Sequence, residues 1–259
     1  MRVTVCELGN SPERLARDWD DLSRHVRTSR SELVLLPEMP FFPWPAWTRT
    51  VDPSMWEQSV AAHDAWLERL GELSPAVVLA TRPVVRDGRR FNQGFARDPE
   101  DGYRAVHDKY YLPDDDGFWE ASWYARGPRD FVPVGLKGVT VGFLICTELW
   151  FTEHARAYAQ AGARVLVCPR ATSASSADKW LAGGRAAAVV SGAYVLSSCF
   201  SGEGPNGMTW AGSGWIIEPQ EGSVLAVTSA GKPFITLDID LRSADQAQQT
   251  YPRYVLDPG

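Results

Sequence analysis

The sequence has few cysteines and histidines, and they do not form the patterns of a metal site or a disulfide framework. The four cysteines, Cys6, Cys146, Cys168 and Cys199, are widely separated, with no C-x-x-C pair and no histidine at ligand spacing. Structural zinc sites use closely spaced pairs of such ligands, and disulfide frameworks are typical of small secreted domains. We therefore expect no metal site, reduced thiols and a cytoplasmic protein.

Long apolar runs and an excess of positive charge are also missing. No run approaches the roughly 18 apolar residues that a transmembrane helix needs. The first residues, Met1 to Leu8, are too short and too polar for a signal peptide and are more typical of a strand. With 26 lysines and arginines against 32 acidic residues, the net charge is −6, so no overall field attracts a nucleic-acid backbone. We expect neither a membrane nor a nucleic acid as a partner.

What is present is a globular composition with alternating strand-like and helix-like segments. Hydrophobic residues make up 44% and charged residues 22% of the chain, which excludes a disordered or fibrous protein. No repeat or linker divides it, so we expect a single domain over residues 1–259. Strands that alternate with helices predict the α/β class. The predicted strands are Val3–Leu8, Leu33–Leu36, Val77–Thr81, Val139–Cys146, Arg164–Cys168, Tyr194–Cys199, Gly214–Glu218 and Phe234–Ile239, and the predicted helices are Ser11–Arg27, Ser54–Leu73, Glu153–Ala161 and Lys179–Ser191.

Glu38 lies directly after the apolar run Leu33–Leu36. In α/β sheets, active groups tend to lie just beyond the carboxyl ends of the strands. Burial beside the aromatic residues that follow would raise the pKa of this carboxyl toward the range of a general base. The alternative is a solvated loop acid or a helix-capping residue.

Cys146 ends the predicted strand Val139–Cys146 and precedes a turn toward a helix. A thiol at such a junction can be activated by backbone N–H groups and a nearby cation. A cysteine at the end of an apolar strand is, however, most often a small buried hydrophobic residue. Cys6, Cys168 and Cys199 lie in strand-like runs and are better interpreted as core residues.

Lys109 lies among aromatic residues in the segment from His107 to Pro113. If its ammonium points inward, it would lower the pKa of a neighbouring thiol and stabilise a developing oxyanion. Otherwise it reaches the surface like most lysines. Glu120 follows eleven residues later, where it could hold Lys109 or a substrate amine, or be a surface acid.

The order of these residues resembles the Glu-Lys-Cys arrangement of the nitrilase superfamily, the carbon–nitrogen hydrolases. The matching segments are Leu36-Pro37-Glu38, then Lys109…Pro113…Gly117-Phe118…Glu120, then Gly142…Ile145-Cys146-Thr147-Glu148-Leu149-Trp150-Phe151. The resemblance covers essentially the whole chain. Within this superfamily, the sequence is most similar to the branch that contains N-carbamoylputrescine amidase. It shares with that branch the segment Pro113-Asp114-Asp115…Phe118-Trp119-Glu120 and the pair Trp150-Phe151.

This resemblance implies a four-layer αββα sandwich, assembled as a homodimer or higher homo-oligomer, without a metal or organic cofactor. It also implies hydrolysis of a non-peptide C–N bond through a thioester. Cys146 would be the nucleophile and Glu38 the general base. Lys109 and the backbone N–H of Thr147 would stabilise the oxyanion, and Glu120 would orient Lys109.

Three further residues are candidates for substrate binding. Trp119 and Trp150 flank the expected catalytic segments and could line a pocket, or pack and exclude water. Arg170 ends an apolar strand and could bind a carboxylate or form a structural ion pair. N-carbamoyl-D-amino acid hydrolases carry an arginine three residues after the nucleophile to bind a carboxylate, whereas this chain has Leu149, which disfavours a carboxylate there.

The expected activity is that of an amidase or N-carbamoyl amide hydrolase acting on a small molecule and releasing ammonia. A nitrilase would need the same Glu38, Lys109 and Cys146, so the sequence leaves that alternative open. Two further alternatives are acyl transfer to an amine and a family member that binds a metabolite without catalysis.

Overall fold

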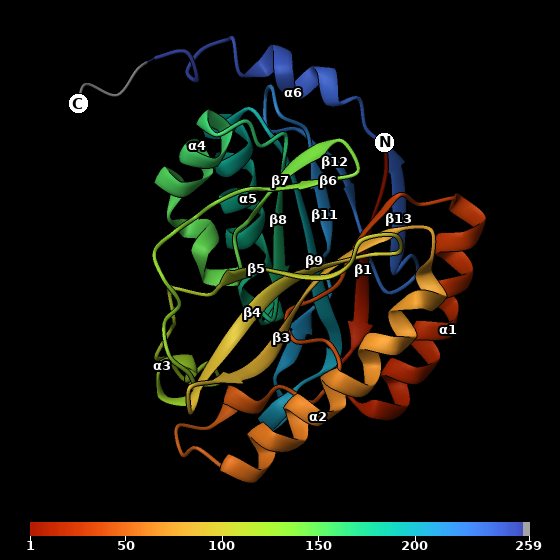
Figure 1. The fold of residues 1–259 in the computed structure, drawn as a ribbon, viewed down its shortest axis with the longest axis vertical. Helices are drawn as coiled ribbons and strands as arrows, with labels where there is room; N and C mark the ends of the chain where they lie inside the picture. The colour runs from red at the N-terminus through yellow and green to blue at the C-terminus, as the bar shows by residue number, and fades with distance from the viewer. Residues whose placement is uncertain (256–259) are drawn as a thin grey trace.

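The computed structural model describes residues 1–255 of the chain as an α/β protein (Figure 1). The strands are β1 (Arg2–Gly9), β2 (Leu33–Leu35), β3 (Val77–Arg86), β4 (Arg89–Asp98), β5 (Gly102–Asp108), β6 (Val134–Leu136), β7 (Val139–Phe143), β8 (Val165–Arg170), β9 (Tyr194–Glu203), β10 (Thr209–Ala211), β11 (Trp215–Ile217), β12 (Val224–Val227) and β13 (Phe234–Asp238). The helices are α1 (Pro12–Ser29), α2 (Pro53–Arg69), α3 (Glu120–Trp123), α4 (Thr152–Gln160), α5 (Ala177–Ser191) and α6 (Leu241–Ala247). No helix within residues 1–255 is both long and apolar enough to cross a membrane.

Strand β1 belongs to two sheets. Its first half pairs in parallel with β2, with Val3 opposite Leu33, and antiparallel with β13. Its second half pairs in parallel with β9, where Glu7 lies opposite Cys199. One sheet then continues through β2 to β3, β4 and β5, and the other through β9 to β8, β7 and β6.

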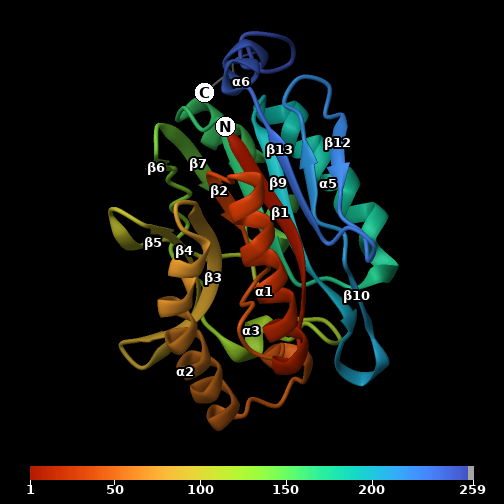
Figure 2. The same cartoon turned by 90° about the vertical axis from the view of Figure 1, so that its right-hand side faces the viewer.

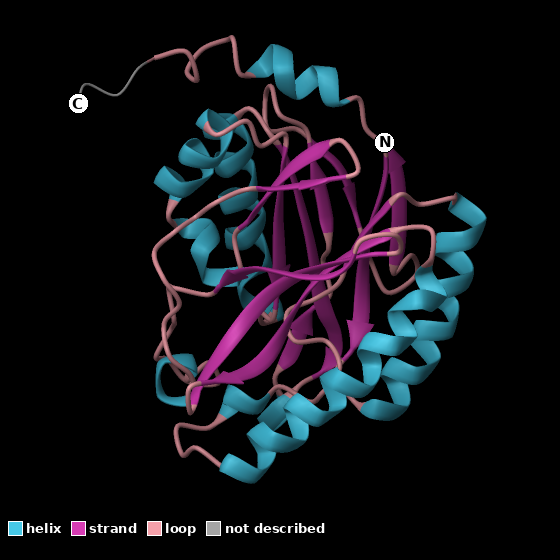
Figure 3. Ribbon diagram, in the orientation of Figure 1, coloured by secondary structure: helices cyan, strands magenta, loops and turns pink. Residues whose placement is uncertain are grey.

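The two sheets stack face to face, and helices cover both outer faces (Figures 1, 2 and 3). Helices α1 and α2 lie on one side, and α4 and α5 lie on the other. The period of two along β1 creates this division, because Val3 and Val5 join the core between the sheets whereas Cys6 and Leu8 pack against α1. The structure confirms the four-layer αββα sandwich.

Helix α1 illustrates how the sequence fixes an outer layer. Ser11 caps its first turn by accepting a hydrogen bond from the backbone N–H of Arg14, and the helix buries residues at a spacing of three and four. These buried apolar residues are Leu15, Trp19, Leu22 and Val26. The stripe that they form packs on the sheet of β1, β2 and β3.

Every predicted strand and helix coincides with an element of the structure, but several boundaries differ. Strand β7 ends at Phe143, three residues before Cys146, because the chain turns there into a short 3-10 helix over Cys146–Trp150. The predicted helix Ser54–Leu73 is α2 followed by a 3-10 turn over Leu70–Leu73. Strands β4 and β5, which the apolar runs did not predict, form an antiparallel pair at the edge of the first sheet.

Candidate active site

Glu38 lies three residues beyond the carboxyl end of β2, with its side chain completely buried. One oxygen, Oε1, accepts hydrogen bonds from Asn92 Nδ2 at 2.7 Å and from Lys109 Nζ at 2.7 Å. The other oxygen, Oε2, is buried and has no hydrogen-bond partner among the described residues. The two oxygens therefore differ, because one is held by donors and the other is free to accept a proton.

Lys109 follows β5 directly, and its backbone N–H donates to the carbonyl of Asn92 on β4. The buried ammonium contacts two carboxylates, Glu38 at 2.7 Å and Glu120 at 2.6 Å. Burial alone would lower the pKa of Lys109, but the charges of Glu120 and Glu38 more than offset this effect and raise it. The lysine is therefore charged at neutral pH.

Glu120 begins the short helix α3 and is also buried. Its carboxylate accepts hydrogen bonds from Lys109 Nζ and from the hydroxyl of Tyr124. Burial raises the pKa of Glu120 to about 7, although the Lys109 ammonium opposes the shift. The structure thus brings Glu38, Lys109 and Glu120 into one buried network.

Cys146 lies at the sharp turn between β7 and α4 and has a positive φ of 47°. Non-glycine residues rarely adopt this conformation, and where it occurs it is often part of an active site. Burial and the nearby charge of Glu38 raise the pKa of the Cys146 thiol, and the Lys109 ammonium lowers it only in part. Lys109 thus lowers the pKa of the thiol, as expected, but burial has the larger effect and the net shift is upward. The thiol is neutral and needs a general base.

The turn also presents backbone N–H groups. Cys146 and Thr147 are the first two residues of the 3-10 helix, whose first internal hydrogen bond runs from the N–H of Glu148 to the carbonyl of Ile145. The N–H groups of the first residues of a helix have no partner within it. They can therefore stabilise a negative charge that develops next to the sulfur.

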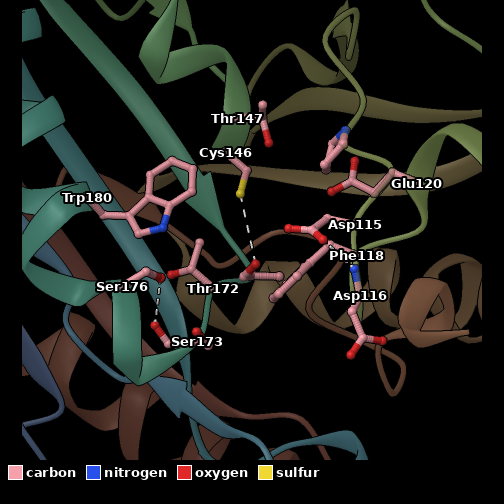
Figure 4. A pocket seen from close by; sticks show the side chains of 12 residues that line it. Asp115, Asp116, Phe118, Glu120, Cys146, Thr147, Thr172, Ser173, Ser176 and Trp180 are labelled. Atoms are coloured by element: carbon pink, nitrogen blue, oxygen red, sulfur yellow. Dashed lines mark hydrogen bonds between the residues drawn. The ribbon is translucent and has the colours of Figure 1, made fainter.

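A cavity of about 330 Å³ opens beside Cys146. Figure 4 shows the sulfur directed into it, between Trp180 on one side and Glu120, Asp115 and Phe118 on the other. The lining residues are Pro113, Asp115, Asp116, Phe118, Glu120, Cys146, Thr147, Ala171, Thr172, Ser173, Ser176 and Trp180. The cavity therefore lies where the ends of several strands meet the start of α5.

The predicted substrate-binding residues divide into two groups. Thr147 lines the cavity, whereas the described lining does not include Trp119, Trp150 or Arg170. Trp119 is partly exposed under the guanidinium of Arg49, and its neighbour Phe118 faces the cavity instead. Trp150 is 44% exposed and packs with its ring centre 5.0 Å from that of Trp180.

Arg170 is completely buried, and protein atoms occupy its donors. Its Nε donates to Ser197 Oγ at 2.6 Å, one terminal nitrogen donates to Thr172 Oγ1 at 2.9 Å, and the other donates to the carbonyl of Ser213. Thr172 lies in the cavity wall. The structure therefore places Arg170 behind the wall, where it holds Thr172 in position.

Sequence reasoning missed Trp180, Thr172, Ser173 and Ser176 as lining residues. Thr172, Ser173 and Ser176 lie between β8 and α5, and Trp180 lies near the start of α5. The apolar pattern predicted the strand and the helix but not which side chains face Cys146. In the part of the chain that the structure describes, no group of three or more metal-ligating side chains is arranged to hold an ion.

Comparison with known proteins gives the family. The family model described as carbon-nitrogen hydrolase matches residues 2–249. Citrullinase from Francisella tularensis subsp. tularensis is 25% identical over 178 residues, which are 66% of this chain and 61% of that protein. N-carbamoylputrescine amidase from Arabidopsis thaliana is 24% identical over 160 residues, which are 56% of this chain and 54% of that protein. The matched part thus spans less than two thirds of the length of each of these relatives.

Solved structures share the fold over nearly the whole chain. A carbon-nitrogen hydrolase from Helicobacter pylori G27 superposes with a TM-score of 0.84 at 20% identity, covering 98% of this chain and 94% of that one. A cysteine-to-alanine variant of an amidase from Nesterenkonia sp. AN1, in complex with butyramide, superposes with a TM-score of 0.78 at 18% identity and covers 95% and 93% of the two chains. From the match over residues 2–249 and this shared sandwich, we conclude that the chain belongs to the carbon-nitrogen hydrolase family.

Proposed function

We propose that this protein hydrolyses the amide or N-carbamoyl amide group of a small molecule and releases ammonia through a thioester at Cys146. The observation that carries the proposal is a cavity lined by a thiol and by Glu120, which connects the cavity to a buried network of charged groups. A buried thiol faces the cavity, a carboxylate with one free oxygen belongs to the network beside it, and an ammonium is shared between two carboxylates. These groups supply a nucleophile, a general base and an electrostatic stabiliser.

In the first half of the proposed reaction, Glu38 takes the thiol proton and the sulfur of Cys146 attacks the carbonyl carbon. The resulting oxyanion is stabilised by the Lys109 ammonium and the backbone N–H of Thr147. Glu38 then gives its proton to the leaving nitrogen, the C–N bond breaks, and ammonia departs. The acyl group remains on the sulfur as a thioester.

In the second half, Glu38 takes a proton from a water molecule that attacks the thioester carbon. The C–S bond breaks, and the proton returns to the sulfur of Cys146. An amide substrate yields a carboxylic acid, and an N-carbamoyl amine yields a carbamic acid that decomposes to carbon dioxide and the amine. Glu120 contributes by fixing the position of Lys109.

The lining of the cavity supports a neutral or cationic substrate. Among the described lining residues, Asp115, Asp116 and Glu120 carry carboxyl groups and none carries a basic group. An anionic group of a substrate would find no basic side chain in this lining, since Arg170 lies behind the wall and each of its guanidinium nitrogens already donates to a protein oxygen. A volume of about 330 Å³ suits a small molecule.

Ammonia release from a substrate panel tests the proposal, with Cys146→Ala and Glu38→Gln proteins as controls. The panel contains short aliphatic amides, N-carbamoyl amines and the matching nitriles, each with a cationic, a neutral and an anionic terminal group. We expect turnover of an amide or N-carbamoyl amine, and a loss of at least about 10³-fold in kcat in both variants, because members of a catalytic unit fail together.

Turnover of nitriles alone would indicate a nitrilase, and product formation that depends on an added amine would indicate acyl transfer. Ammonia release that persists in the Cys146→Ala protein would contradict the thioester mechanism. Absence of turnover, combined with alkylation of Cys146 no faster than that of the other cysteines, would favour a metabolite-binding protein.

A further inference from the structure

We propose that Glu148 and His107 are positioning residues that hold the Cys146 turn against the Lys109 segment. This inference rests on the proposed function, because it concerns the distance between the nucleophile and the ammonium. Neither side chain lines the cavity, so neither contacts the substrate.

The carboxylate of Glu148 connects the two catalytic segments through backbone hydrogen bonds. Its Oε2 accepts from the N–H of Ile145 at 2.8 Å, and its Oε1 accepts from the N–H of Tyr110 at 2.7 Å. Ile145 directly precedes Cys146, and Tyr110 directly follows Lys109. One completely buried carboxylate thus bonds the neighbour of the nucleophile and the neighbour of the ammonium.

His107 completes this connection from the other side of Lys109. Its Nε2 lies 2.9 Å from Oε2 and 3.0 Å from Oε1 of Glu148, and the ring packs 4.8 Å from that of Phe131. A carboxylate buried this deeply is costly unless a donor or an opposite charge satisfies it. His107, two residues before Lys109, supplies both when it is protonated.

The protonation of His107 is set by the groups around it. Burial lowers the pKa of the imidazole, but the charge of Glu148 and its hydrogen bond outweigh burial, so the pKa is raised. Asp108 on the same strand and Asp130 before β6 act in the same direction, and His154 in α4 is a further titratable neighbour. Because the pKa of His107 is raised in the folded state, the His107–Glu148 pair contributes its full stabilisation of the fold below the unfolded pKa of about 6.5. This stabilisation is lost as the pH rises through the pKa of His107 in the folded state.

A loosened connection should slow the chemical step more than it weakens binding. If the turn moves away from Lys109, the oxyanion is no longer placed near the ammonium, although the cavity still accepts the substrate. A misplacement of about 1 Å can cost roughly 100-fold in rate. The expected signature is therefore a fall in kcat with KM nearly unchanged.

Two substitutions of His107 separate positioning from simple packing. In the His107→Gln protein the amide nitrogen can still donate to Glu148 but does not titrate. We expect it to retain kcat within several-fold of the wild type at pH 7, with the alkaline decline of kcat that the imidazole causes in the wild type removed. The His107→Phe protein keeps a ring but lacks the donor, and we expect kcat to fall about 100-fold.

The Glu148→Gln substitution removes the negative charge that His107 and the two backbone N–H groups share. We expect kcat to fall about 100-fold, as in the His107→Phe protein. Glu153→Gln, which alters an exposed carboxylate in the next turn of the chain, is the matched control and should leave kcat unchanged. All variants are compared after thermal unfolding has shown a cooperative transition. If the His107→Phe or the Glu148→Gln protein does not fold, the pH profile of the His107→Gln protein still tests whether His107 acts as a positioning residue.

The rate of Cys146 alkylation by acrylamide, followed by mass spectrometry, adds a readout that needs no substrate. We expect slower alkylation in the His107→Phe and Glu148→Gln proteins. A wild type that hydrolyses the panel while these variants keep its kcat, or a His107→Gln profile identical to that of the wild type, would overturn the inference. A wild type that hydrolyses nothing but shows the alkylation difference would contradict the proposed function and support the positioning role.

Discussion

Glu7 is a buried carboxylate that takes no part in the proposed reaction. It lies in the half of β1 that pairs with β9, and its Oε1 has no hydrogen-bond partner within residues 1–255. Burial raises the pKa of Glu7 to about 7, although a hydrogen bond from Thr228 and the charge of Arg14 oppose the shift. The folded state therefore holds a proton there that the unfolded chain releases at a lower pH.

The consequence is a pH-dependent loss of stability. Because the folded-state pKa is raised, the free energy of unfolding should fall as the pH rises from about 4.5 to about 7 and should lose no more above that range. At 1.36 kcal/mol per pKa unit, the loss for Glu7 is up to about 3 kcal/mol. A Glu7→Gln protein should lack this pH-dependent part of the free energy of unfolding.

Urea unfolding of both proteins at pH 5 and pH 8 measures the difference, since all other titrating groups are shared. We expect the wild type to lose up to about 3 kcal/mol relative to the Glu7→Gln protein between the two pH values. Parallel stabilities at both pH values would show that Glu7 titrates normally.

At the scale of single residues, the order of residues along the chain was enough to predict the residues of the candidate site, but not their environment. Glu38 and Cys146 follow apolar runs, and their order with Lys109 and Glu120 identifies the family pattern. The protonation state of the thiol was not predictable, because it depends on how completely burial removes Cys146 from solvent. The role of Trp180 in the cavity wall depends likewise on the tertiary packing of α5.

At the scale of elements, Gly142 shows why β7 can lie so close to α4. A Cβ atom at this position would lie 2.6 Å from the ring of Tyr158 in α4 and 2.8 Å from Leu166 on β8. The ring of Tyr158 is buried, and its hydroxyl donates a hydrogen bond to the carbonyl of Phe143, so the ring cannot yield as the end of a flexible side chain can. Only glycine therefore fits where the strand passes beneath the helix.

We expect Gly142→Ala to destabilise the protein by about 1–3 kcal/mol through overpacking. Gly135→Ala on the neighbouring strand β6 is the matched control, since a Cβ there meets no atom within 4 Å. Urea midpoints of the two variants measure the contrast. Equal midpoints would mean that α4 moves away from the strand at little cost.

The elements that sequence reasoning found and missed differ in where they are buried. Strands such as β2 and β8 are buried on both faces, so they appear as continuous apolar runs. Strand β5 lies at the sheet edge and exposes the residues of its middle, whereas β4, between β3 and β5, buries polar residues such as Asn92 and Gln93, so neither strand appears as an apolar run. The short strands β6, β10 and β12 are defined by their pairing partners rather than by their own composition.

At the scale of the whole molecule, we propose that the chain self-associates through the surface formed by the start of α4 and residues 251–255. Tyr251 and Tyr254 are 73% and 61% exposed, and Tyr251 and Val255 line one surface hollow together with Thr152 and Arg156 of α4. The Arg156 guanidinium also donates a hydrogen bond to the carbonyl of Val255. Exposed apolar groups gathered on one face are typical of an interface. The family resemblance also implies a homodimer.

Sedimentation velocity at micromolar concentration tests this proposal. We expect a species of about twice 28.7 kDa, and a Tyr251→Asp protein that dissociates more readily. Val85→Asp, which alters an exposed apolar residue at the end of β3, is the control and should not change the mass. A wild type that remains strictly monomeric would contradict self-association.

The place of β1 in both sheets has a consequence for synthesis on the ribosome. The strand is translated long before its neighbours β9 and β13, which follow it by more than 180 residues. Pairing between segments so far apart in sequence is slow, and an unpaired strand edge can recruit other chains. During synthesis, the edges of β1 that later pair with β9 and β13 therefore stay open longer than the edge that pairs with β2, and this is the period in which the strand is most prone to aggregate.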